Sequence, residues 1–530
     1  MRPAALALGV IALALPAAAA GDARALSRTI DAHLGAALTK ARLTPAGRAE
    51  PHELLRRIYL DVLGRLPTPE EAEAYFQNPE PEKHHRLIDT LLAHPEMPVF
   101  WRGVFHGWLN GAQPEKRFGE PEFLAFLEKR LADNVGWDKL AAELLDPAQG
   151  DATAAAAGYY LAHRLTGDRA SQLDAMTVSV SSVFFGVQMQ CAKCHDHPTV
   201  PGWKQANYYG LAAFLGRTFP AKGAFNLPGL TEKADGEVKF AGRGKPEQTA
   251  DLLFLDGRVI AAEGSRRKAL VAVGVSAANP YFKRAMANRM WKQLMGVGLV
   301  EPVDQIHAAN PASHPDVLDA LADDFAANGF DLRRLMAAVL HSDAYLRSSR
   351  WPGPGPRPAP DRYAVAGLKP LTPPQLALAL AQATGHVDVL RAKFEKGKAK
   401  SPPDPGTDKL GTPAVVRKPF ERDREYAALL VRFRQDGEPF QANAAHALYL
   451  TYNPQVRAML GPAGVVGKLT KLKDADVARV AYLTALSRPP TAAEAAEVAA
   501  HLATPGVPRE ELCRDVVWAL VAGTEFRFNH

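Results

Sequence analysis

The sequence predicts a mostly α-helical, multi-helical protein with repeated helical hairpins. Three observations support this: apolar residues recur at helix-face spacing along most of the chain, good caps and stops separate these stretches, and one hairpin occurs twice. With 530 residues, 47% of them hydrophobic, the chain can bury more than one core. Short alternating runs add a small β-containing segment between the two halves.

The N-terminal segment, residues 1–20, reads "MRPAALALGVIALALPAAAA". One Arg precedes a short apolar run that ends in small residues, which is typical of a cleavable secretory signal peptide. We therefore expect a periplasmic or secreted protein, with a retained N-terminal anchor as the alternative. No later run of 18 apolar residues occurs, so no transmembrane span is expected after cleavage.

The first hairpin follows in "PHELLRRIYLDVLGRLPTPEEAEAYF". Its first helix is expected to stop at Gly64, and Thr68 is a good N-cap for the second, with Pro69 at the first helical position and Glu71 as the capping-box partner. The first helix carries one apolar stripe, formed by Leu54, Leu55, Ile58, Tyr59, Val62 and Leu63.

A second copy of this hairpin occurs near the other end, in "YLTALSRPPTAAEAAEVAAHL". Matching positions carry the same residue types, which indicates an internal repeat. Chance recurrence of good caps and turns is the alternative. The matched residues are Tyr59, Arg65, Pro67, Thr68 and Glu71 in the first copy and Tyr482, Arg488, Pro490, Thr491 and Glu494 in the second.

The domain organisation is expected to follow the Gly-rich and Pro-rich interruptions. The segments are a signal peptide over 1–20, a helical N-terminal domain over 21–215, a Gly-rich linker with short strands over 216–270, the first part of a helical C-terminal domain over 271–350, a Pro-rich connector over 351–374, and the remainder of that domain over 375–530.

Charge and cysteine content limit the function. The net charge of +6 comes from 63 basic and 57 acidic residues spread along the chain, so no nucleic-acid partner is expected. Three cysteines cannot form a disulfide framework in so long a chain, and Cys513 fits a buried, inert thiol. His341, in "VLHSDAY", reads as an ordinary helix-end histidine.

The segment "CAKCHDHP" holds the other two cysteines and supports three interpretations. In the first, Cys191 and Cys194 attach a c-type haem and His195 is its axial iron ligand. In the second, zinc is bound by Cys191, Cys194 and either His195 or His197, with one distant ligand. In the third, Cys191 and Cys194 form a local disulfide or remain thiols.

The missing ligand of the first two interpretations has two candidates. His307 and His314, in "HAANPASHP", can approach the cysteine motif if the two halves of the chain pack together, as a distal haem ligand or as the fourth zinc ligand. Capping of helices and turns is the ordinary role of such residues. No hydrolase or transferase motif accompanies the site, so the chain is not assigned as an enzyme and a redox carrier is favoured.

Several long motifs resemble a known family. They are "RRIYLDVLGRLPTPEE", "CAKCHDHP", the stretch from "NPYFKRAMANRMW" to "VLHSDAYLRSS", and the terminal "EFRFNH". They are similar to a pair of domains of unknown function first described in planctomycetes: a planctomycete cytochrome-c-like domain followed by a planctomycete-specific domain. The resemblance implies haem binding only through the same C-x-x-C-H signature.

Two function classes follow from these observations. The chain is expected to be an exported electron-transfer protein with one covalent haem and a redox protein as its partner. The alternative is a helical binding or scaffold protein of the cell envelope, whose C-x-x-C-H-x-H segment is a zinc or disulfide staple.

Overall fold

A computed structural model describes residues 17–111, 118–147, 152–198, 200–223, 226–242, 246–261, 263–390, 392 and 452–530. Most of the expected signal peptide, residues 1–16, and residues 393–451 of the expected C-terminal domain lie outside the described residues. Within the described part, no helix is long and apolar enough to cross a membrane.

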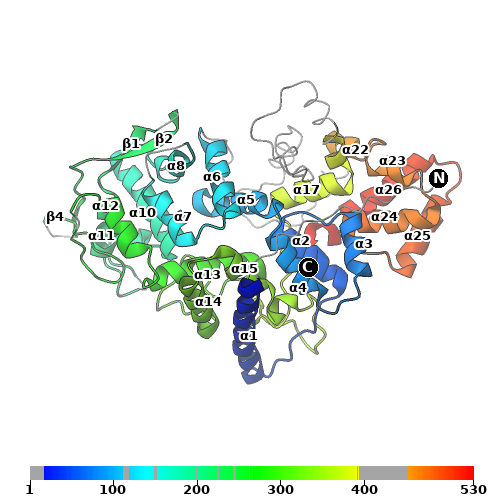
Figure 1. The fold of residues 1–530 in the computed structure, drawn as a ribbon, viewed down its shortest axis with the longest axis horizontal. Coiled ribbons are helices and arrows are strands. Elements are labelled where there is room, and N and C mark those ends of the chain that lie inside the picture. The colour runs from blue at the N-terminus through cyan, green and yellow to red at the C-terminus, as the bar shows by residue number, and fades with distance from the viewer. Residues whose placement is uncertain are drawn as a thin grey trace.

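The fold is mostly α-helical, as the sequence predicts (Figure 1). The helices of the first half are α1 (Ala17–Lys40), α2 (Pro51–Val62), α3 (Pro69–Gln77), α4 (Lys83–Leu92), α5 (Glu96–Asn110), α6 (Glu120–Ala132), α7 (Trp137–Leu145), α8 (Ala152–Ala157), α9 (Tyr159–Ala162), α10 (Arg169–Phe185) and α11 (Gln205–Leu215). Those of the second half are α12 (Arg266–Gly274), α13 (Pro280–Met295), α14 (Pro315–Ala327), α15 (Leu332–Leu340), α16 (Asp343–Leu346), α17 (Pro373–Ala383), α22 (Pro454–Met459), α23 (Val465–Leu469), α24 (Asp474–Leu486), α25 (Ala492–Leu502) and α26 (Arg509–Ala522).

The expected β segment lies between the two halves. Strand β1 (Thr218–Lys222) pairs antiparallel with β2 (Pro228–Glu232), and β3 (Lys239–Ala241) pairs antiparallel with β4 (Glu247–Thr249). A third pair joins β5 (Lys369–Pro370) to β6 (Phe528–Asn529), which brings the C-terminal end of the chain beside the segment that precedes α17.

Two hydrophobic cores organise these helices. The larger core holds residues from Ala23 to Tyr363 together with Leu483 of α24, so α1 to α15 pack as one body that includes residues from both halves of the chain. The smaller core gathers α17 and α22 to α26. Helix α2 serves both cores: its predicted apolar stripe faces the larger one, whereas Leu60 belongs to the smaller one.

The hairpin repeat is confirmed by the local chemistry of α2–α3 and α24–α25. Both second helices begin with a capping box, formed by Thr68 with Glu71 and by Thr491 with Glu494. The capping glutamate also receives a two-pronged ion pair in each copy. Arg65 donates to both oxygens of Glu71 at 2.7 and 2.9 Å.

The same arginine binds a further glutamate in each copy. Nε of Arg65 lies 2.6 Å from Glu96, and Nε of Arg488 lies 2.7 Å from Glu525. The guanidinium carbon of Arg65 also lies 5.2 Å from the ring centre of Tyr59, and that of Arg488 lies 5.2 Å from the ring centre of Tyr482. The repeat therefore preserves a whole cation-centred network and not only a cap.

The polar face of α2 is buried as well, which its single predicted stripe does not indicate. Arg56 donates to the backbone oxygens of Ala485 and Phe526 at 3.2 and 2.8 Å. Asp61 accepts from Lys369 Nζ at 2.6 Å and from Asn529 Nδ2 at 2.8 Å. The C-terminal tail therefore docks on α2 through buried polar groups: Arg56 is hydrogen-bonded to backbone oxygens, and Asp61 is paired with Lys369.

Candidate functional site

The cysteine motif lies between α10 and α11, in a short 3-10 turn over Gln190–Lys193. Helix α10 ends at Gly186, whose φ of 64° is in the left-handed region. A Cβ atom on Gly186 would lie 2.7 Å from Cδ1 of Ile306, so glycine also allows the close approach of that residue. The backbone N–H of Ile306 donates to the Gly186 oxygen at 2.9 Å.

Ionic and amide contacts fix the turn on the helices beside it. Lys193 Nζ lies 3.2 Å from Asp174 Oδ2 on α10. Gln205, at the start of α11, donates from Nε2 to the Lys193 oxygen at 3.1 Å, and its backbone N–H donates to Asp196 Oδ1 at 3.0 Å. The turn is therefore held from both sides while its thiols face outward.

The predicted site residues Cys191, Cys194 and His195 are all exposed in the structure. Both thiols are free, and no disulfide joins them to each other. His195 Nδ1 lies 2.7 Å from the backbone oxygen of Asp196. Because a carbonyl only accepts, Nδ1 carries the hydrogen, and Nε2 of the neutral ring keeps its lone pair for a ligand.

His197 has the opposite hydrogen-bonding pattern to His195. Its Nδ1 accepts the backbone N–H of Val200 at 3.2 Å, so the neutral ring carries its hydrogen on Nε2 and has no further lone pair. Its ring packs edge-on against Trp203, with centroids 5.4 Å apart. Burial, followed by the neighbouring His195, lowers the pKa of His197, which favours this neutral form.

Of the two distant histidines, His307 lies near the motif. Its ring centre is 5.3 Å from that of Trp203 and 6.4 Å from that of His197. Nδ1 of His307 is buried and has no hydrogen-bond partner. His314 instead packs against Tyr363, with ring centroids 5.4 Å apart, and its Nδ1 lies 3.2 Å from Ser313 Oγ.

Hydrogen bonds from Asp304 and Arg289 bring the second half of the chain to this motif. Asp304 accepts from Ser182 Oγ at 2.9 Å and from Gln188 Nε2 at 2.7 Å. Arg289 donates to the backbone oxygen of Ser182 at 3.1 Å. These pairs are more than 100 residues apart in the chain, so no local sequence signal reveals them.

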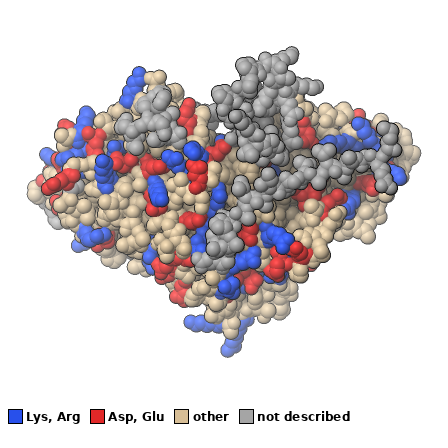
Figure 2. Space-filling model, in the orientation of Figure 1, with Lys and Arg blue, Asp and Glu red and all other residues tan. Residues whose placement is uncertain are grey.

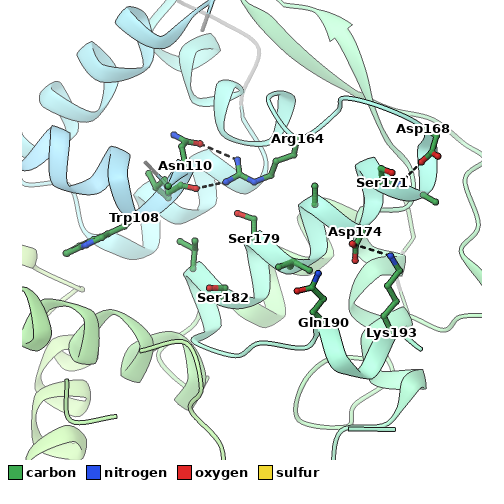
Figure 3. A pocket seen from close by; sticks show the side chains of 16 residues that line it. Trp108, Asn110, Arg164, Asp168, Ser171, Asp174, Ser179, Ser182, Gln190 and Lys193 are labelled. Carbon is green, nitrogen blue, oxygen red and sulfur yellow. Dashed lines mark hydrogen bonds and ion pairs between the residues drawn. The ribbon is translucent and has the colours of Figure 1, made fainter. Parts of the chain in front are cut away.

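A cavity of about 520 Å³ opens beside the turn, between the end of α5 and α10 (Figure 3). Its volume is in the range of small-molecule sites. The motif contributes Gln190 and Lys193 to the described lining, and Asp174 faces Lys193 across one edge (Figure 3). The wall is mixed in character, with Trp108, Leu109, Val178 and Val183 beside Arg164, Asp168, Ser171, Ser179 and Ser182.

A structural zinc site requires ligand atoms that lie close together. In a tetrahedral zinc site with bonds of about 2.0–2.3 Å, neighbouring ligand atoms lie about 3.3–3.8 Å apart. Among the described residues, one group of three His, Cys, Asp or Glu side chains has ligand atoms all within 4.8 Å of one another, and it lies elsewhere, at Glu82, His84 and His85. The motif's thiols and imidazoles do not converge in this way. The motif instead presents two exposed free thiols and, at His195, an imidazole whose Nε2 keeps its lone pair.

Charges of both signs are mixed over the visible face of the molecule (Figure 2). This face therefore carries no large single-sign field.

Comparison with known proteins gives two family matches along the chain. Residues 29–219 match the family PSCyt2, described as a protein of unknown function (DUF1549). Residues 266–402 match PSD1, described as a protein of unknown function (DUF1553). No curated protein and no solved structure matches the chain. The motif and its supports on α10 and α11 lie in the first match, whereas Asp304 and His307 lie in the second.

Proposed function

The chain belongs to the proteins in which a DUF1549 domain is followed by a DUF1553 domain, and we propose that it is an exported electron-transfer protein with one c-type haem. Cys191 and Cys194 hold the haem through thioether bonds, and Nε2 of His195 is its axial ligand. The observation that carries this proposal is the hydrogen bond from His195 Nδ1 to the Asp196 oxygen, because it leaves Nε2 ready for iron.

The state of the two cysteines supports the same assignment. Thioether formation requires a free thiol for each vinyl group, and both thiols are unpaired and exposed. The haem, when bound, supplies one-electron chemistry. The protein contributes the fixed turn: the Lys193 pairing with Asp174 and the Gln205 hydrogen bonds set the position of the thiols relative to His195.

The location of the motif indicates how electrons would be exchanged. The motif lies on the outer surface, so a redox partner protein can approach it directly, and solvent exposure is one of the factors that set the potential of such a centre. The proposed compartment is the periplasm or the extracellular space, where the partner is a redox or cell-envelope protein.

A second candidate function rests on His307. Its Nδ1 is buried without a hydrogen-bond partner close to the motif, as expected of a zinc ligand in a scaffold protein whose cysteines form a metal staple. That site would require His197 to give up its hydrogen bond from Val200 or would require His195 to turn toward the cysteines. The haem proposal needs neither change, so we favour it.

Expression of the full chain with a cytochrome c maturation system tests the proposal. We expect a visible absorption band that survives denaturation of the wild type and is absent from Cys191→Ala/Cys194→Ala. Cys513→Ala is the matched control, because Cys513 is buried in the smaller core, and it should keep the band. A colourless wild type that contains a zinc ion lost in Cys191→Ser/Cys194→Ser would replace the haem proposal with the staple.

A further inference from the structure

A cluster of metal-binding side chains lies outside the cysteine motif, at the start of α4. Glu82, His84 and His85 each place one ligand atom within 4.8 Å of the others, the one such group among the described residues. His85 Nε2 lies 3.0 Å from Glu82 Oε2, and His84 Nε2 lies 3.8 Å from the same oxygen. Two imidazoles and one carboxylate are a common ligand set for zinc.

His84 provides an independent indication of a bound group. Its side chain is 4% exposed, and its Nε2 is buried without a hydrogen-bond partner. A buried polar atom without a partner costs free energy, so natural proteins rarely leave one without a compensating ligand, ion or water. This nitrogen is directed toward Glu82 Oε2, where His85 Nε2 also converges.

A chain of short contacts continues behind His85. Nδ1 of His85 lies 2.8 Å from Nδ1 of His341, and Nε2 of His341 lies 2.8 Å from Asp89 Oδ1. Asp89 is also paired with Arg24 at 3.1 Å. Metal-bound histidines usually have their second ring nitrogen held by a carboxylate or by another polar group, and this arrangement provides such support.

The contacts from Glu82 to Asp89 contain one more pair of facing atoms than the two neutral imidazoles have hydrogens to fill. Three contacts of 2.8–3.0 Å join Glu82, His85, His341 and Asp89, and each requires a hydrogen or an ion between its two atoms. Two neutral imidazoles supply two hydrogens. If His341 donates to Asp89 and His85 donates to His341, the lone pair of His85 Nε2 faces the Glu82 carboxylate directly.

Either an additional proton or a metal ion can lie between His85 Nε2 and Glu82 Oε2. A proton satisfies only the pair of Glu82 and His85 and leaves His84 Nε2 without a partner. A metal ion at the same place binds all three converging atoms. The geometry therefore favours the metal.

We propose that Glu82, His84 and His85 bind one divalent transition-metal cation of the zinc type, and that His341 and Asp89 orient His85 for it. The separations of 3.0 and 3.8 Å bracket the spacing of about 3.3–3.6 Å expected between nitrogen and oxygen ligands of tetrahedral zinc. The Glu82 side chain is 62% exposed, so the ion is accessible from solvent and a fourth position is open to water.

This site lies where the two matched segments meet. Helix α4 belongs to the DUF1549 match and contacts α15 of the DUF1553 match (Figure 1). His341 is the C-cap residue of α15. A metal bound to His85 on α4 therefore fixes the ring that contacts His341 at the end of α15. Arg48 lies 3.6 Å from Glu82 Oε1, and its positive charge lowers the affinity of the site for a cation.

Metal titration of the purified full chain, after removal of metals with a chelator, tests this proposal. We expect one Zn²⁺ equivalent that Glu82→Gln weakens at least about tenfold, the lower end of the effect of disturbing a zinc site. Glu80→Gln is the matched control, because Glu80 is a nearby exposed glutamate paired with Arg86, and it should bind zinc like the wild type. Equal affinities of the wild type and Glu82→Gln would overturn the proposal.

The cysteine motif is separated from this site by two further measurements. Co²⁺ bound in place of Zn²⁺ should give ligand-field absorption without a thiolate charge-transfer band. The binding of one Zn²⁺ per chain should persist in Cys191→Ser/Cys194→Ser. Loss of the equivalent in that double variant would assign the metal to the cysteines and contradict the proposal. Asp89→Asn should weaken zinc binding about 10- to 100-fold, with the melting temperature in chelator close to that of the wild type.

Discussion

Nδ1 of His195 donates a 2.7 Å hydrogen bond to the backbone oxygen of Asp196, the second residue after Cys194. This contact fixes the tautomer of an exposed ring next to two free thiols. In His197, only two residues further, the Nδ1 lone pair accepts the N–H of Val200 instead. The two histidines of the motif are therefore chemically distinct, and the first is the one able to bind a metal through Nε2.

Replacement of each histidine tests this distinction. His195→Ala should retain haem on the two thiols but change the visible spectrum, because the axial nitrogen is lost. His197→Ala should leave the spectrum unchanged, since the Nδ1 of this ring accepts the N–H of Val200 and its Nε2 carries the hydrogen. The measurement is the absorption spectrum of both oxidation states for each variant. Equal spectral changes in both variants would show that the tautomer argument is wrong.

Asp174 connects the motif to α10 and should contribute to stability. It accepts from the hydroxyl of Tyr208 and pairs with Lys193. Asp174→Ala leaves the hydroxyl of the buried Tyr208 without its acceptor, and we expect a loss of about 1–3 kcal/mol in the free energy of unfolding. Asp174→Asn keeps an acceptor and should cost less. Urea denaturation measures both, and equal losses would mean that the hydrogen bond is not the cause.

The two copies of the hairpin offer a matched comparison of buried and exposed ion pairs. Arg65 is 7% exposed and pairs with Glu96 at 9%, so Arg65→Met strands a buried carboxylate and should cost about 3–5 kcal/mol. The glutamate partners of Arg488 are 26% and 35% exposed, and Arg488→Met should cost about 1–2 kcal/mol. Chemical denaturation of both variants checks the order, and a larger loss in Arg488→Met would contradict it.

Glu494 predicts a specific pH dependence. Its hydrogen bonds with Arg488 outweigh burial and lower its pKa from 4.5 to about 2. A lowered carboxyl pKa means that the unfolded chain binds the proton first, so this stabilisation is complete above pH 4.5 and is lost as the pH falls toward 2. Glu494→Gln should flatten the pH dependence of the unfolding free energy across this window. Glu497→Gln, on the exposed side of the same helix, should retain it.

Local sequence patterns predict much of the helical fold. Thr68 and Thr491 mark the starts of α3 and α25 because a capping box depends only on residues within one turn. The stripe through Ile58 is confirmed as a core face, because 3.6-residue periodicity follows from burial. The buried partners of Arg56 and Asp61 are at least 284 residues away in the chain, and local patterns carry no such information.

The candidate site shows the same division. The spacing of Cys191, Cys194 and His195 is visible in the sequence, but the tautomer of His195 depends on the folded turn. His341 is a helix-end residue, as the sequence predicts, yet its contacts with Asp89 and His85 appear only once α15 packs on α4. Adjacent histidines in "EKHHR" were the one local signal for the second site, and adjacent histidines alone are weak evidence of a metal.

Covalent attachment of haem is the central claim, and the intact mass of the denatured full chain tests it most directly. After expression with a cytochrome c maturation system, we expect a mass increase of one haem in the wild type and in His195→Ala. We expect no increase in Cys191→Ala/Cys194→Ala. An unmodified mass in the wild type, under conditions where a known c-type cytochrome is matured in the same cells, would show that the chain does not attach haem.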